Sequence, residues 1–153
     1  MRWHALGGRE SAKAVGIGIT VSILTAAFMV AGLKTGVSPL PKPLGLAFAE
    51  TVLQRPLPLP IGLLFHTVWT TAFSVLYVIL FREGLTFLRA LALATALWVL
   101  VLVFFFPVVG WGFLGLAVTP KIIVGAAVPH LLFAIVLWAL CRWLFAPRAM
   151  AYT

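Results

Sequence analysis

"FLRALALATALWVLVLVFFF", residues 87–106, decides the fold of this chain. The run contains a single charged side chain, Arg89, close to its beginning. An α-helix needs roughly 20 mostly apolar residues to cross the hydrocarbon core of a bilayer. The stretch therefore predicts a membrane-spanning helix.

Three further runs meet the same criterion, at residues 14–33, 61–81 and 122–145. The first is longer than the apolar region of a secretory signal, and no small-residue cleavage site follows it directly. We therefore expect it to be retained as a span. The predicted fold is all-α, with four transmembrane helices in an antiparallel bundle that forms one domain over residues 1–153.

Composition supports lipid as the surroundings of this bundle. Hydrophobic residues make up 63% of the chain and charged residues only 9%, whereas a soluble domain carries about 25% charged residues. The formal net charge is +8, but the basic residues stand singly beside apolar runs, as membrane flanks do. They form no basic stripe, so no nucleic-acid partner is expected. The single cysteine, Cys141, excludes an intrachain disulfide and is expected to be a buried small hydrophobe.

The basic residues also predict an orientation. Seven of the eleven fall on the side of the two termini, and the other four, Lys34, Lys42, Arg55 and Lys121, fall on the opposite side. The positive-inside rule then places both termini in the cytoplasm, in a cell inner membrane.

The connections differ in character. Residues 82–86 make a tight turn, which predicts that the second and third spans form an antiparallel hairpin. Residues 34–60 contain two Pro-x-Pro-x-Pro runs, expected to be stiff and extended. Between these runs, residues 44–54 are expected to form a short helix on the membrane face, where Glu50 would pair with Arg55 or with a histidine. The glycine-rich residues 107–121 are typical of an interfacial or re-entrant segment.

An internal repeat is one interpretation of these connections. Both contain "LGLA", at 44–47 and 114–117, and each is followed by a proline and then by a span with a histidine. A duplication would give two units of two spans that enter the membrane in the same direction.

Polar residues inside the spans mark the candidate site. His66, Thr70, Ser74 and Tyr77 share one helix face, which we expect to turn toward the bundle interior. His130 lies at a similar depth in the fourth span. Pro129 removes a backbone donor there and is expected to kink the helix, with Gly125 making room beside His130. In the first span, Gly18, Ser22 and Ala26 have the spacing that favours close helix approach.

Three functions remain open from these residues. No catalytic motif and no metal site is apparent, so the first is a non-enzymatic accessory or structural subunit of a larger membrane assembly. The second is a small transporter or channel component that uses the His66 stripe. The third is a bundle that binds a haem or a chlorophyll-type pigment through His66 and His130, although no cofactor is required. The small size of the bundle favours a homo-oligomer or a larger membrane-protein complex.

Overall fold

The computed structural model describes residues 7–81 and 84–145. Four helices are long and apolar enough to cross a membrane. These are α1 (Gly8–Lys34), α3 (Leu59–Phe81), the span Phe87–Val108, and α6 (Lys121–Phe145). The span Phe87–Val108 joins α4 (Phe87–Leu100), a π-helical turn η1 (Val101–Phe105) and α5 (Phe106–Val108). All four predicted spans are confirmed, and the first begins six residues earlier than the apolar run that predicted it.

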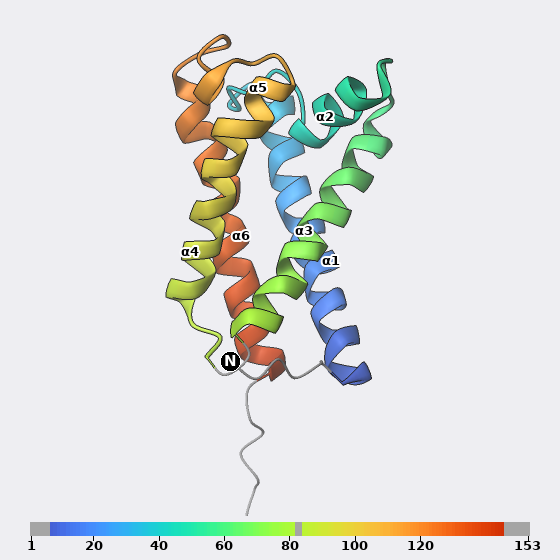
Figure 1. The fold of residues 1–153 in the computed structure, drawn as a ribbon, viewed down its shortest axis with the longest axis vertical. Coiled ribbons are helices and arrows are strands. Elements are labelled where there is room, and N and C mark those ends of the chain that lie inside the picture. Colours follow the sequence, from blue (N-terminus) through green and yellow to red (C-terminus); the bar gives the residue numbers. More distant parts are fainter. Residues whose placement is uncertain (1–6, 82–83, 146–153) are drawn as a thin grey trace, which may run out of the picture.

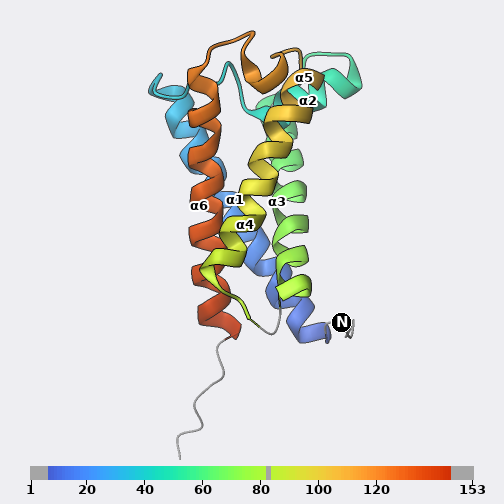
Figure 2. The ribbon, with the colours of Figure 1, turned by 60° about the vertical axis from the view of Figure 1, so that its left-hand side comes forward.

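The four spans form an upright bundle (Figures 1 and 2). The first residues of α1 and the last residues of α6 lie at one end, which we call the terminal end. The opposite end carries the connections and is called the connection end. There the short helix α2 (Leu44–Leu53) and α5 close the bundle.

Helix pairing differs from the expected hairpin. α1 packs along α3, α4 packs along α6, and α1 also contacts α6. α3 and α4 are antiparallel neighbours in sequence, but they make few contacts with each other. Figure 1 shows them separating from the turn toward the connection end. The tight turn sets their direction, whereas packing against α1 and α6 sets their positions.

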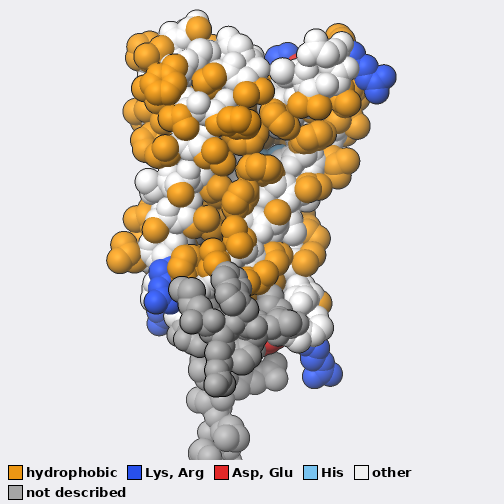
Figure 3. All heavy atoms as spheres, in the orientation of Figure 1, with side chains coloured by type: hydrophobic (Ala, Val, Ile, Leu, Met, Phe, Trp, Pro, Cys, Tyr) orange, Lys and Arg blue, Asp and Glu red, His pale blue; other side chains and the backbone are white. Residues whose placement is uncertain are grey.

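The surface of the bundle fits a lipid environment. Apolar side chains cover the middle of the face in Figure 3, and the visible Lys and Arg side chains lie toward its two ends. Large aliphatic side chains point outward along the spans, among them Val68, Leu88 and Val124, each more than 60% exposed. Lipid chains can cover such a surface at no hydrophobic cost, so the four spans support a multi-pass membrane protein.

The contact between α1 and α3 depends on Gly18, the first of the small residues singled out in the sequence. A Cβ at position 18 would lie 2.7 Å from the Thr71 Cα, which is well inside van der Waals contact. One turn further on, the Ser22 hydroxyl donates to the Thr67 hydroxyl over 2.8 Å. Small side chains thus allow close backbone approach and a hydrogen bond between helices.

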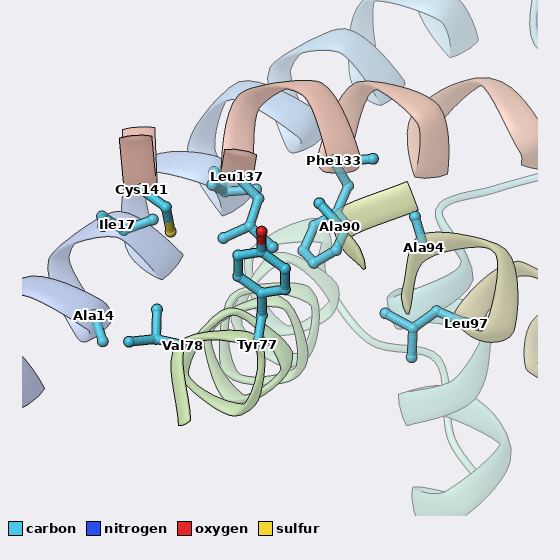
Figure 4. Packing of buried hydrophobic residues seen from close by; sticks show 12 residues of the cluster. Ala14, Ile17, Tyr77, Val78, Ala90, Ala94, Leu97, Phe133, Leu137 and Cys141 are labelled. Atoms are coloured by element: carbon cyan, nitrogen blue, oxygen red, sulfur yellow. The ribbon is translucent and has the colours of Figure 1, made fainter. Parts of the chain in front are cut away.

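A tightly packed core occupies the half of the bundle nearer the terminal end (Figure 4). Tyr77 reaches from α3 toward Leu137 of α6 and Ala90 of α4. Its hydroxyl donates to the Thr86 carbonyl over 2.9 Å. Cys141 is fully buried in the same cluster, as expected for a small hydrophobe.

The first connection is fastened to the bundle at both ends of α2. Near the N-terminus of α2, Gly45 lies against Gly62 of α3, and a Cβ at position 62 would lie 2.7 Å from the Leu46 Cα. Further along, Glu50 forms an ion pair with Lys42 at 2.7 Å and accepts the Leu57 amide at 3.2 Å. The hydrogen bond from Lys42 holds the pKa of the Glu50 carboxyl below its usual range. The expected pairing of Glu50 with Arg55 or a histidine is wrong. The partner of Glu50 is Lys42, which lies in the segment just before α2.

The extended proline segment that precedes α2 also meets α6. The Pro39 ring occupies the space in which a side chain at Gly125 would lie. Gly125 therefore makes room for this connection, and the expectation that it frees space beside His130 is wrong. Proline suits this position because it has no backbone N–H, so no donor is left unpaired where the segment crosses α6.

The two "LGLA" segments adopt different structures. Residues 44–47 begin the α-helix α2, whereas residues 114–117 overlap the short 3-10 turn η2 (Phe113–Gly115). Leu114 has a φ of +57° there, a conformation that leucine rarely adopts. Helix pairing does follow the proposed units, since α1 packs on α3 and α4 on α6. The duplication stays a prediction.

We expect Gly18→Ala to lower the free energy of unfolding by about 1–3 kcal/mol, because the added methyl group forces α1 away from α3. Gly16→Ala is the matched control on the same helix, since a Cβ at Gly16 meets nothing within 4 Å. That control should leave stability unchanged or raise it by up to about 1 kcal/mol. Thermal unfolding of both variants in detergent makes the comparison, and equal stability would contradict the close approach.

Candidate functional site

A cavity of about 410 Å³ lies in the half of the bundle nearer the connection end. Its walls come from α1, α3, the π-helical turn η1 and α6, and α2 lies over it with Leu44, Gly45 and Phe48. It occupies the region where α3 and α4 separate. Three of its lining residues, Leu64, Val68 and Trp69, are exposed on the outer surface of α3. The cavity therefore reaches the surface that faces lipid.

Both histidines singled out in the sequence line this one cavity. They come from different helices, α3 for His66 and α6 for His130, and each is partly buried. The spans that carry them run in the same direction, so two rings at similar depth meet the same space. The sequence indicated their depth, but it could not show that the two rings share a site.

His66 is held by α1. Its Nε2 lies 3.0 Å from the Thr25 hydroxyl, which also lies 2.8 Å from the Val21 carbonyl. The Thr25 hydroxyl also lies 3.2 Å from the Ser22 carbonyl. A hydroxyl and an imidazole nitrogen can each donate or accept, so either group can be the donor in the Thr25–His66 bond. This bond holds the His66 ring against α1.

His130 is held by its own helix. Its Nδ1 lies 2.7 Å from the Ala126 carbonyl, one turn earlier in α6. Since the carbonyl only accepts, Nδ1 carries the hydrogen and Nε2 is left as an acceptor. α6 continues as a helix through Pro129, which itself lines the cavity. The predicted kink at Pro129 stays a prediction.

The predicted polar stripe on α3 divides into two parts. His66 and Thr70 line the cavity, and the next two members do not. Ser74 is fully buried and donates to the Thr70 carbonyl over 2.8 Å. The Tyr77 hydroxyl donates to the Thr86 carbonyl near the terminal end. The stripe does face the bundle interior as expected, but only its first two residues are available to a ligand.

An aromatic wall completes the cavity, and sequence reasoning missed two of its members. Phe48 of α2 contacts Phe65 of α3 and Phe105 of η1, with ring centroids 6.0 and 5.1 Å apart. Phe105 also meets Trp69 edge to face at 5.2 Å. The π-helical turn that carries Phe105 has no clear signal in an unbroken apolar run. Turns of this kind are frequent at functional sites.

The chemistry of the lining is that of a binding site. Its polar groups are the Thr25 and Thr70 hydroxyls, the His66 and His130 rings and the indole N–H of Trp69, and the remaining lining residues are apolar, glycine or proline. None of the lining residues is a carboxylate, lysine or arginine. In the described ranges, no three His, Cys, Asp or Glu side chains are grouped so that they could hold a metal ion. A few convergent polar groups in an apolar cavity of this size are typical of small-molecule sites, which span roughly 300–1,000 Å³.

No protein-family model, curated protein or solved structure matches this chain. The functional conclusion therefore rests on the geometry of the cavity.

We expect Thr25→Val to lower the free energy of unfolding by about 1 kcal/mol, because it removes the hydrogen bond between Thr25 of α1 and His66 of α3. Thr20→Val is the matched control on the same helix. The Thr20 hydroxyl bonds only to the Gly16 carbonyl of its own turn and is exposed. Equal unfolding midpoints for the two variants in detergent would show that the bond between α1 and α3 does not stabilise the bundle.

Proposed function

We propose that this chain is a non-enzymatic accessory subunit of a larger membrane assembly, and that its part is to hold an apolar molecule in the cavity between α3 and α4. The observation that carries the proposal is the shared cavity itself, where two histidines from different helices meet an otherwise apolar lining.

The position of the cavity supports a ligand that is dissolved in the bilayer. The exposed residues at its edge, Leu64, Val68 and Trp69, lie on the lipid-facing side of α3. α2 covers the connection end and is held against α3 by the Gly45–Gly62 contact, while the Lys42–Glu50 ion pair ties α2 to the segment before it. A molecule that enters from the side exchanges lipid contacts for aromatic contacts, and it gains hydrogen bonds that lipid chains do not offer.

The polar groups of the cavity support binding rather than catalysis. General acid–base chemistry commonly relies on paired or strongly perturbed titratable groups, and this lining has no carboxylate or lysine. The cavity also supports ligand binding better than transport. Ser74 and Tyr77 do not line it, so its polar lining does not continue toward the terminal end. For orientation, we propose that the terminal end faces the cytoplasm of a cell inner membrane, since most basic residues of the sequence lie on that side.

A bromoalkylbenzene tests occupancy, because bromine in contact with Trp69 quenches its fluorescence. We expect saturable quenching in the purified protein and loss of the saturable part in Trp69→Phe. Ala126→Leu, which narrows the cavity, should weaken binding about tenfold or more. The matched control is Val128→Leu on the same helix, because Val128 is exposed and does not line the cavity. Quenching that rises linearly with probe concentration in both the unaltered protein and the Trp69→Phe variant would overturn the proposal.

One observation also favours a second candidate, a haem or chlorophyll-type ligand. A histidine that binds a metal commonly donates its other ring N–H to a carbonyl or carboxylate, and His130 Nδ1 does so with Ala126. Purification from native membranes separates the candidates. An accessory subunit brings a partner in fixed stoichiometry, without an absorption band of a tetrapyrrole. A strong visible band would favour the second candidate, and a homo-oligomer without partner would contradict the accessory role.

A further inference from the structure

The hydrogen bond of His130 leaves the cavity with an acceptor to offer. His66 Nε2 bonds to the Thr25 hydroxyl, where either group can donate, whereas His130 donates Nδ1–H to the Ala126 carbonyl. No carboxylate lines the cavity to pair with an imidazolium, and burying an unpaired charge is costly. We therefore take both rings as neutral. The Nε2 of His130 then carries no hydrogen.

This nitrogen is not used within the described part of the chain, because no hydrogen bond joins His130 Nε2 to a described residue. It is also not sealed inside the protein, because among the described residues the one buried side-chain polar atom without a partner is the Thr71 hydroxyl. His130 lines the cavity, so a ligand can reach this nitrogen.

The remaining polar groups do not reverse this conclusion. The Thr25 and Thr70 hydroxyls can donate or accept, and the Trp69 indole N–H can only donate. A ligand that only accepts, such as a ketone or an ether, can pair with these donors but leaves His130 Nε2 unpaired.

We propose that the ligand of this cavity is an apolar molecule with a hydroxyl group that donates to the free Nε2 of His130. This inference rests on the proposed function, and it narrows the ligand to hydroxylated membrane compounds. Two sources share that chemistry, a phenol or quinol and an aliphatic lipid alcohol. The aromatic wall of Phe48, Phe105 and Trp69 offers edge-to-face contacts to the former.

The test compares three probes of matched size on the purified protein: a para-alkylphenol, its methyl ether and the corresponding alkylcyclohexanol. Each dissociation constant is expressed as the mole fraction of probe in the detergent phase. Differences between the probes in partition from water then do not affect the comparison. Trp69 fluorescence reports binding, with Trp69→Phe as the blank. We expect the phenol to bind about tenfold more tightly than its ether, as one added hydrogen bond would give.

Two variants assign the preference to His130. In His130→Leu and in His130→Phe, the ratio of phenol to ether affinity should fall toward one while the ether still binds. Ether binding also shows that the cavity is intact, and if one variant does not fold the other supplies the comparison. The alkylcyclohexanol separates the sources, since equal binding of both alcohols indicates a lipid alcohol and preference for the phenol indicates a quinol-like compound.

The outcomes distinguish this inference from the proposed function. Equal affinity of phenol and ether in the unaltered protein overturns the hydroxyl donor and leaves the cavity as a binding site. A preference that persists in both His130 variants also overturns it, because the acceptor would then lie elsewhere. Binding of none of the three probes overturns the proposed function itself.

Discussion

The close approach of α1 and α3 at Gly18 and Thr71 is the constraint on which the rest of the bundle depends. It draws α3 onto α1, so the helix that follows α3 in sequence is free to pack on α6 instead. The bundle is consequently tight near the turn between α3 and α4, where Tyr77 reaches across. Toward the connection end α3 and α4 separate, and the cavity lies between them.

The polar side chains in the spans follow from the same arrangement. A hydroxyl or imidazole inside a bilayer needs partners within the protein. Thr25, Ser22 and Ser74 find theirs in neighbouring side chains or in carbonyls one turn away. Each histidine bonds within the protein through one ring nitrogen, His66 to Thr25 and His130 to the Ala126 carbonyl. The Nε2 of His130 is left available in the cavity, so a structural role and a ligand-binding role coexist at His130.

Much of the fold could be predicted from the sequence, because apolar length and basic flanks determine where helices begin and end in lipid. The four spans, the short helix after the first proline run and the inward stripe on α3 were all predictable. The partner of each helix was not, since a close approach at Gly18 and a bond between Ser22 and Thr67 require knowledge of which faces meet. Two further contacts depend on the path of the first connection. They are the ion pair of Glu50 with Lys42 and the packing of the Pro39 ring against Gly125. Phe105 was missed because nothing in its apolar surroundings distinguishes a π-helical turn.

The covering of the cavity by α2 has a consequence for how occupancy would be controlled. The close contact of Gly45 and Leu46 with Gly62 holds α2 against α3, so exchange through the connection end would require this contact to open. The exposed edge at Leu64 and Val68 gives a lateral route instead. Occupancy would then follow the two-dimensional abundance of the ligand among the lipids, and a change in membrane composition would alter the state of this protein without any change in the surrounding water.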